Sequence, residues 1–318
     1  MSALHPTHGK YSDCSGCSLC LLVCPVWREH RDLCLTPHGH AKALQQGIIT
    51  EEMATNTLSC SLCMACLPVC PENLDIVEMI LNLRRQLKVP DGQRERLLSM
   101  NSTPTTLPLT SCSTLLLPDL ALQAAPRILS RTLDLLQIRQ AADDGADIAL
   151  ALESATTIPE LRLQQFLAPL RSLKKIIVAE GLLLRQLRRW LPATKIIGLG
   201  EALSSQENVR RNLRANDLYV IEPRAYHADY SRLVKYYDRL RTIHHCAFNL
   251  DLQRIAIPAT VRNLQQRLGL AEPDDAAQTR WVLQGRQIDR IVVENLEDRA
   301  AFAAVCDIPV LHLAELAT

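Results

Sequence analysis

The chain has 318 residues, 47% of them hydrophobic, a length and composition typical of two packed domains rather than one. Its formal net charge is +1, which argues against nucleic acid as the main partner, because phosphate binding needs a clear basic excess. Apolar stretches such as Ile176–Leu184 fall short of the roughly 20 residues of a transmembrane helix, and the first ten residues lack the apolar core of a secretory signal. We therefore expect a folded, soluble, cytoplasmic protein.

Cysteine is the residue whose number stands out, with twelve in the chain and nine of them within the first 70 positions. Without a secretory signal, so many thiols point to metal or redox chemistry rather than to disulfides. Eight of the nine form two copies of the pattern C-x2-C-x2-C-x3-C-P, which holds [4Fe–4S] clusters. The first copy is Cys14, Cys17, Cys20 and Cys24, followed by Pro25, and the second is Cys60, Cys63, Cys66 and Cys70, followed by Pro71. Zinc is the alternative, but zinc bound by C-x2-C pairs would leave four of the eight thiolates without a role.

The spacing also predicts which cysteines share a cluster. Three thiolates on a tight loop can each reach a different iron of one cube, whereas the fourth points away and serves the other cluster in two-cluster proteins. The pattern therefore predicts two [4Fe–4S] clusters whose fourth ligands are exchanged. The first cluster is assigned Cys14, Cys17, Cys20 and Cys70, and the second is assigned Cys60, Cys63, Cys66 and Cys24. No residue is assigned a catalytic role.

The segments around the two motifs are typical of helices. Ala41–Gln46 and Thr50–Leu58 lie between the motifs, and the second of them starts with acidic residues that suit a first helical turn. Asn73–Lys88 follows the second motif with apolar residues at near-helical spacing. We expect an α-helical dicluster ferredoxin domain over residues 1–100. Cys34 lies outside both motifs, and we interpret it as structural, with a redox role as the alternative.

The remaining two thirds of the chain are predicted to be an α/β domain. The polar stretch Asn101–Thr106 is typical of a linker. Beyond it, short apolar segments alternate with helical patterns, which indicates parallel sheet. Eight strands are predicted: Thr114–Leu117, Ile148–Leu152, Lys175–Ala179, Lys195–Leu199, Leu218–Glu222, Ile255–Pro258, Arg290–Glu294 and Val310–Leu313. Four strands fall in each half, so we expect a duplicated α/β domain over 107–318, with halves of about 107–210 and 211–318.

Taken together, these features resemble the iron–sulfur subunits of the anaerobic glycerol-3-phosphate dehydrogenase, glycolate oxidase and heterodisulfide reductase type. Those proteins join a helical dicluster domain to a pair of cysteine-rich (CCG) domains. Where they carry a Pro-Arg-Gly-Arg stretch between the motifs, this chain has Pro37-His38-Gly39-His40. Where their first half has a strand ending in Gly-Cys, this chain has Thr110-Ser111-Cys112. Where their second half has His-x-Pro-Cys-His, it has Glu222–His227.

The departure from that family is informative. Its CCG halves carry adjacent cysteine pairs, whereas residues 101–318 contain only Cys112, Cys246 and Cys306. We therefore interpret the second part as a degenerate CCG-like domain that serves for docking and holds no further cluster.

The function predicted from the motifs and the resemblance is electron transfer through two [4Fe–4S] clusters within a larger redox complex. The resemblance implies a flavoprotein dehydrogenase as the donor and a membrane or soluble acceptor, such as a quinone-linked partner, which would also attach this cytoplasmic chain to a membrane. Two alternatives stay open. One is a self-contained iron–sulfur oxidoreductase with its substrate site in the C-terminal domain, and the other is a redox-sensing interaction protein.

Overall fold

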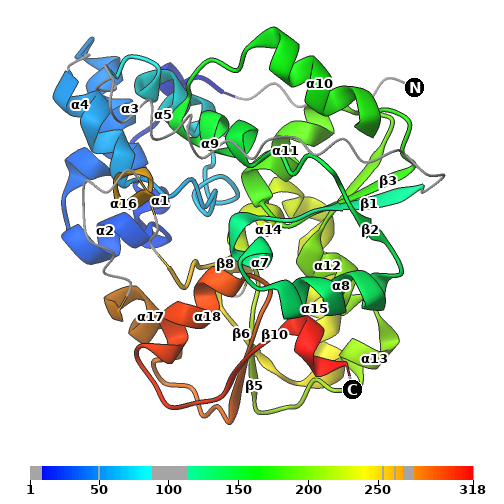
Figure 1. Ribbon diagram of the computed structural model, residues 1–318. Coiled ribbons are helices and arrows are strands. Elements are labelled where there is room, and N and C mark those ends of the chain that lie inside the picture. The colour runs from blue at the N-terminus through cyan, green and yellow to red at the C-terminus, as the bar shows by residue number, and fades with distance from the viewer. Residues whose placement is uncertain are drawn as a thin grey trace.

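The computed structural model describes residues 9–48, 51–87, 113–252, 254–260, 263–267 and 276–317. An N-terminal helical region packs against a larger α/β part that contains two parallel sheets (Figure 1). The predicted linker Asn101–Thr106 and Cys112 lie outside the described residues.

Short helices separated by loops make up the N-terminal region. They are η1 (Tyr11–Asp13), α1 (Leu19–Leu22), α2 (Pro25–His30), η2 (Leu33–Leu35), α3 (Pro37–Gln45), α4 (Glu51–Asn56), η3 (Thr57–Ser59) and α5 (Ile76–Arg84). Side chains cap the two longest: the Thr36 hydroxyl accepts a hydrogen bond from the Gly39 N–H, and the Asp75 carboxylate accepts one from the Glu78 N–H. The three helices predicted around the motifs are confirmed as α3, α4 and α5 within the described residues.

The first sheet has four parallel strands in the spatial order β2-β1-β3-β4. Its strands are β1 (Thr114–Leu117), β2 (Arg139–Gln140), β3 (Lys175–Val178) and β4 (Lys195–Gly198). The helices around it are α7 (Leu120–Gln123), α8 (Pro126–Leu136), α9 (Ala146–Ser154), α10 (Glu160–Leu170), α11 (Gly181–Trp190), α12 (Leu199–Ser204) and α13 (Glu207–Arg210). Strands β1, β3 and β4 each bury three consecutive residues, as expected for a sheet covered on both faces.

The second sheet repeats this topology. Its four parallel strands are β5 (Asp217–Val220), β6 (Ala247–Phe248), β9 (Arg290–Val293) and β10 (Val310–His312), in the spatial order β6-β5-β9-β10. In both sheets the strand that comes first along the chain lies between the second and the third, so the predicted duplication is confirmed at the level of topology. The other elements of this half are α14 (Pro223–Ala228), α15 (Tyr230–His244), β7 (Leu250–Asp251), β8 (Ile255–Ala256), α16 (Leu264–Arg267), α17 (Ala276–Leu283), α18 (Leu296–Ala303) and η4 (Leu313–Leu316).

One predicted strand is wrong, and another is a strand that lies outside the parallel sheets. Ile148–Leu152 lies inside α9, because its Ala-Leu repeat favours a helix and a short apolar run does not distinguish a buried helix from a strand. Ile255–Pro258 contributes only β8, which pairs with β7 in a separate antiparallel hairpin. The second strand along the chain is instead β2 in the first sheet and β6 in the second. Each has only two residues, too few to show a hydrophobic period.

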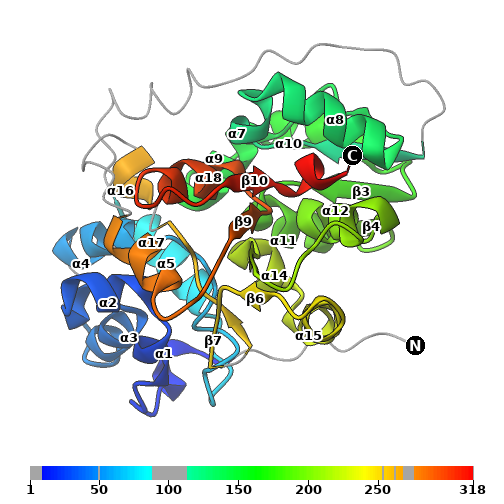
Figure 2. The ribbon, with the colours of Figure 1, turned by 90° about the horizontal axis from the view of Figure 1, so that it is seen from below.

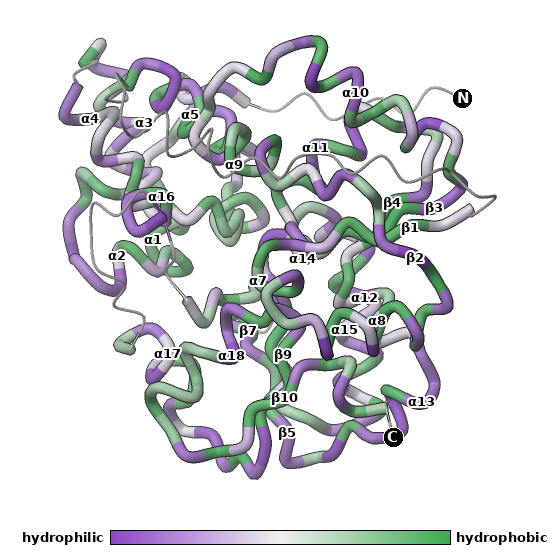
Figure 3. The backbone as a smooth tube through the Cα atoms, in the orientation of Figure 1, coloured by the Kyte–Doolittle hydropathy of each residue, from purple (hydrophilic) through white to green (hydrophobic). Residues whose placement is uncertain are grey.

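Clusters of buried side chains connect these parts. One cluster of buried side chains joins the first sheet to the second, for example Ile177 with Tyr219 and Val292. Another joins the second sheet to the N-terminal region through Val23 and Ala65. Hydrophobic residues gather along the central strands (Figure 3). None of the helices in the described residues is both long and apolar enough to cross a bilayer.

Candidate metal centre

The two cysteine loops have the same backbone shape. In the first loop, Gly16 and Ser18 have positive φ angles of 80° and 64°. At the matching places in the second loop, Leu62 and Met64 have φ angles of 51° and 62°, although residues with a Cβ rarely adopt this conformation. Burial of both side chains compensates for the backbone strain, since Leu62 and Met64 are almost fully enclosed. Loops with left-handed residues can turn backbone N–H groups to one side, an arrangement that binds anions such as iron–sulfur clusters.

Each loop lines a cavity to which the other loop also contributes a cysteine. The first cavity is lined by Cys14, Cys17, Cys20 and Cys70, and the second is lined by Cys24, Cys60, Cys63 and Cys66. The other residues of both linings are mainly apolar, including Ala41 and Leu74 in the first and Val23 and Ile80 in the second. Four thiols around an apolar cavity form a donor set that fits a cubane cluster, which each thiolate binds through a different iron.

The thiols are held where ionisation without a metal is unfavourable. Burial, together with repulsion from Cys14, Cys17 and Cys70, raises the pKa of Cys20 to about 12. Burial likewise raises the pKa of Cys24 to about 12, with Cys60 and Cys63 adding to the effect. The cysteines that raise each pKa by repulsion are thus the ones that line the same cavity. Because only the thiolate binds iron, a bound cation has to supply the stabilisation that water would otherwise give.

The first loop is held by its own region. The Lys42 ammonium on α3 donates to the Cys14 carbonyl oxygen at 3.0 Å, and the Gln45 amide donates to the same oxygen at 2.9 Å. Gln45 also donates to the carbonyl oxygens of Tyr11 and Ser12. One turn of α3 therefore fixes the backbone on which the first cysteine lies.

The second loop is held by buried side chains, two of which come from the α/β part. Arg84 on α5 donates to the Cys60 carbonyl oxygen at 2.6 Å. From α14, Arg224 donates to the Ser61 carbonyl oxygen at 2.5 Å, and the His227 Nδ1 atom donates to the Cys63 carbonyl oxygen at 2.8 Å. Burial lowers the pKa of His227 to about 4, so its ring is neutral and carries its proton on Nδ1.

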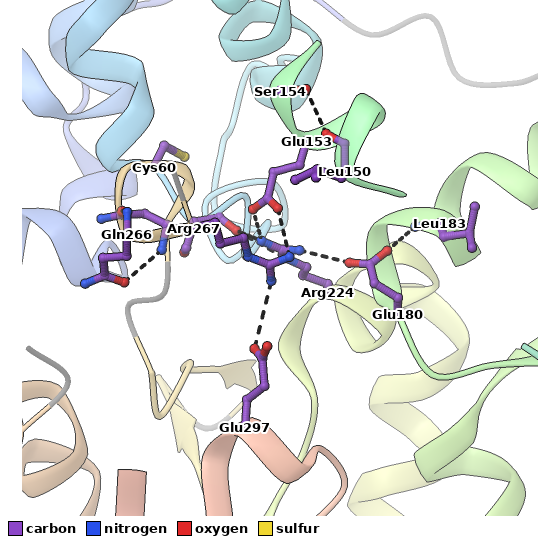
Figure 4. Close-up of polar contacts among 12 residues, drawn as sticks. Cys60, Leu150, Glu153, Ser154, Glu180, Leu183, Arg224, Gln266, Arg267 and Glu297 are labelled. Atoms are coloured by element: carbon purple, nitrogen blue, oxygen red, sulfur yellow. Dashed lines mark hydrogen bonds and ion pairs between the residues drawn. The ribbon is translucent and has the colours of Figure 1, made fainter. Parts of the chain in front are cut away.

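A single buried carboxylate holds these arginines together. Glu153 on α9 is 1% exposed and pairs with Arg224 at 2.6 Å and Arg267 at 3.1 Å, while its carbonyl oxygen accepts from Arg84 (Figure 4). Burial opposes ionisation of Glu153, but the three arginines outweigh it and lower the pKa to about 2. Arg224 also pairs with Glu180 at 2.9 Å. The network ties the second cysteine loop to both sheets.

The two loops differ in their access to solvent. Cys17 is exposed, and its neighbours Leu19 and Leu22 are 41% and 57% exposed. Cys63 and the residues beside it are covered by α14 and α15, since His227 contacts the loop and Tyr230 packs in the same apolar cluster as Cys63. Figure 2 shows the cysteine region against the end of the α/β part that carries α14 and α17. The first site is thus open to solvent, and the second faces the interior.

The remaining cysteines of the described residues line neither cavity. Cys34 is exposed, and its backbone N–H donates to the Asp32 carboxylate. Cys246 is buried in the core shared by the two sheets, and Cys306 packs with the opposite face of the second sheet. Sequence reasoning missed Arg84, Glu153 and Arg224. The one signal in the sequence was the segment Glu222–His227, which contains Arg224 and His227. It lies where the iron–sulfur subunits that the sequence resembles have His-x-Pro-Cys-His.

Residues 10–74 match a family model described as a 4Fe-4S dicluster domain. No curated protein and no solved structure matches the chain. The matched domain implies two [4Fe–4S] clusters as cofactors and iron–sulfur electron transfer as the class of function. Two parallel α/β sheets follow it.

Proposed function

We propose that this chain is the iron–sulfur electron-transfer subunit of a larger redox complex, of the type found with anaerobic glycerol-3-phosphate dehydrogenase and glycolate oxidase. Its donor is a flavoprotein dehydrogenase and its acceptor is quinone-linked or soluble. Cys14, Cys17, Cys20 and Cys70 bind one cluster, and Cys60, Cys63, Cys66 and Cys24 bind the other. The dicluster domain occupies residues 1–100, and the duplicated domain occupies 107–318.

The observation that carries this proposal is the closeness of the two cysteine-lined cavities. Pro37 and Ile76 line both of them, so one layer of side chains separates the two sites. Each [4Fe–4S] cluster, when bound, supplies a site that takes up and releases one electron. Two such sites across so thin an apolar wall suit electron exchange, and the surrounding apolar residues tune the potentials by excluding water.

Solvent access supports a direction for the path. The exposed loop around Cys17, with Leu19 and Leu22 beside it, offers a protein partner close approach to the first site. The second site has its loop clamped by Arg224 and His227 of the α/β part. Electrons therefore pass between a protein partner at the Cys17 surface and the first cluster. They pass from there to the second cluster, which lies on the α/β side.

Purification of the native complex under anaerobic conditions tests the proposal. We expect a flavoprotein to co-purify, and addition of its substrate should reduce both clusters at least as fast as the complex turns over. Clusters that stay oxidised during turnover would contradict electron relay and favour a structural or sensing role. A variant with a bulky charge at the exposed surface, Leu22→Glu, should slow reduction by the partner without changing the iron content.

A second candidate is a self-contained iron–sulfur oxidoreductase. The observation that favours it is a cavity of about 230 Å³ in the α/β part, which is lined by Cys63 of the second loop. This candidate predicts that the isolated chain turns over a small substrate with an artificial electron donor, whereas an electron-transfer subunit does not.

A further inference from the structure

The cavity beside Cys63 lies where the carboxyl ends of both parallel sheets meet. Its wall includes Asp119 after β1, Glu180 after β3, Glu222 after β5 and Asn295 after β9. Its volume of about 230 Å³ is large enough for a molecule of several non-hydrogen atoms. The cavity therefore joins the two halves of the duplicated part to the second cysteine loop.

The topology makes this position a site for ligands. In the first sheet the chain passes from β1 to β2 on one side and later to β3 on the other, so the loops after β1 and β3 diverge. In the second sheet the loops after β5 and β9 diverge in the same way. Ligands of open parallel sheets bind at such switch points. Here two switch points face one cavity.

The charge of the cavity wall selects the ligand. Six lining residues are acidic and two, Arg224 and Arg267, are basic. Both arginines pair with Glu153 behind the wall, and within the wall Arg224 also pairs with Glu180 and Arg267 with Glu297, so the acidic residues remain in excess (Figure 4). Helix N-termini, which would otherwise attract anions, are capped by the cavity's own carboxylates: Asp119 accepts from the Leu122 N–H, and Glu180 accepts from the Leu183 N–H. The wall therefore repels anions such as phosphate.

Two carboxylates of the same wall, those of Asp119 and Glu222, are held where ionisation is unfavourable although Arg267 and Arg224 partly oppose the effect. Burial, together with repulsion from Glu297 and Glu180, raises the pKa of Asp119 to about 6. Burial raises the pKa of Glu222 to about 8, with Glu180 again adding. A positively charged group in the cavity would stabilise the ionised form of both carboxylates.

The lining suits an organic cation better than a metal ion. Within the described residues, no three His, Cys, Asp or Glu side chains are close enough together to bind one ion. Leu117, Ala149, Leu150 and Leu183 add an apolar wall that suits a carbon skeleton. Ser61, which is 5% exposed, lines this cavity and the second cysteine cavity; its hydroxyl can donate to the Cys63 thiol, and its oxygen accepts no hydrogen bond among the described residues. An ammonium or guanidinium N–H is a suitable partner for that oxygen.

We propose that this cavity binds a small organic cation with an apolar body, held by Asp119 and Glu222 and in contact with the loop that carries Cys63. Binding itself rests on the cavity, and its effect on electron flow rests on the proposed function. Reduction adds negative charge to a cluster, so a bound cation should raise the reduction potential of the cluster next to Cys63.

Anaerobically purified, cluster-loaded protein allows a direct test. The probes are n-butylammonium, 1,4-butanediammonium and benzylammonium chlorides, with sodium butyrate and benzoate as anions of matched size and ionic strength. Calorimetry or saturation-transfer NMR measures binding. Asp119→Asn removes a charge but keeps the helix cap, and Ala149→Phe fills the apolar wall. Asp143→Asn is the control, because Asp143 pairs with Arg162 and does not line the cavity.

We expect at least one ammonium probe to bind, with affinity at least tenfold weaker in Asp119→Asn and Ala149→Phe and unchanged in Asp143→Asn. In an EPR-monitored titration, the bound probe should raise the potential of one cluster only. Binding of the carboxylates instead, equal binding in Asp119→Asn, or no binding by any probe would overturn the proposal. A bound amine that leaves both potentials unchanged would refute contact with the second cluster. None of these results depends on a partner protein, so they are independent of the test of electron relay.

Discussion

Replacing Glu153 by Gln should destabilise the protein and loosen the second cysteine loop before the first. The substitution keeps the side-chain shape but removes the one carboxylate shared by Arg224 and Arg267. The pKa of Glu153 falls from 4.5 to about 2 on folding, which corresponds to about 3 kcal/mol at neutral pH. That value agrees with the roughly 3–5 kcal/mol that breaking a buried ion pair costs.

The pH dependence of this loss has a defined sign. A carboxylate with a lowered pKa stabilises the folded state above its unfolded pKa of 4.5, and this contribution is lost as the pH falls toward 2. The difference in unfolding free energy between the two proteins should therefore be largest above pH 5 and shrink in more acidic solution. Anaerobic urea titration followed by circular dichroism measures it. Asp143→Asn, which affects a half-buried pair with Arg162, should cost at most about 1 kcal/mol.

The consequence for the clusters is the more specific part of the prediction. Arg84 and Arg224 hold the carbonyl oxygens of Cys60 and Ser61, and both depend on Glu153 for charge compensation. The first loop is held separately by Lys42. Under challenge with an iron chelator, Glu153→Gln should release one cluster several times faster than the other, as resolved by EPR or Mössbauer spectroscopy. Equal acceleration of both clusters, or none, would refute this reasoning.

Three further outcomes are expected. Glu294 accepts hydrogen bonds from two buried tyrosines, and burial raises its pKa from 4.5 to about 7, so the folded state favours the protonated form. Relative to Glu294→Gln, the unfolding free energy should therefore fall by about 3 kcal/mol as the pH rises from 4.5 to 7 in urea titrations. Gly181→Ala places a Cβ closer to the Arg224 Cβ than van der Waals contact allows, so it should lower the unfolding free energy by about 1–3 kcal/mol in the same assay. An unchanged value would mean that α11 and α14 can separate freely. The domain over 107–318 is predicted to hold no cluster, so iron and sulfide analysis should give the same content, about eight irons per chain, after its three cysteines are changed together to Ala; a loss of about four irons would show a cluster there. Those cysteines are Cys112, Cys246 and Cys306.

Local chemistry explains which parts could be predicted from the sequence. Cysteine spacing specifies a cluster loop without reference to the rest of the chain. The strands β3, β4 and β9 were predictable because Ile and Val runs buried on both faces have few other conformations open to them. Ile148–Leu152 was not, since α9 and a buried strand share the same composition.

The parts that were not predictable depend on long-range contacts. Arg224 and the Ser61 carbonyl oxygen that it binds are 163 residues apart, and Glu153 is 71 residues from Arg224. A buried arginine looks like a surface arginine in a single sequence, because burial comes from the fold and not from the side chain. The cavity beside Cys63 arises in the same way, from two switch points that only the packed sheets bring together.

The proposed exchange of the fourth ligands is the central feature to measure, because with it the two cysteine motifs would form a single electron-transfer unit. EPR and Mössbauer spectra of Cys70→Ser and Cys24→Ser can be compared with those of Cys17→Ser and Cys63→Ser, which mark the first and second clusters. Cys70→Ser should perturb the same cluster as Cys17→Ser, and Cys24→Ser the same cluster as Cys63→Ser. The exchange would be contradicted if Cys70→Ser perturbed the same cluster as Cys63→Ser, and Cys24→Ser the same cluster as Cys17→Ser.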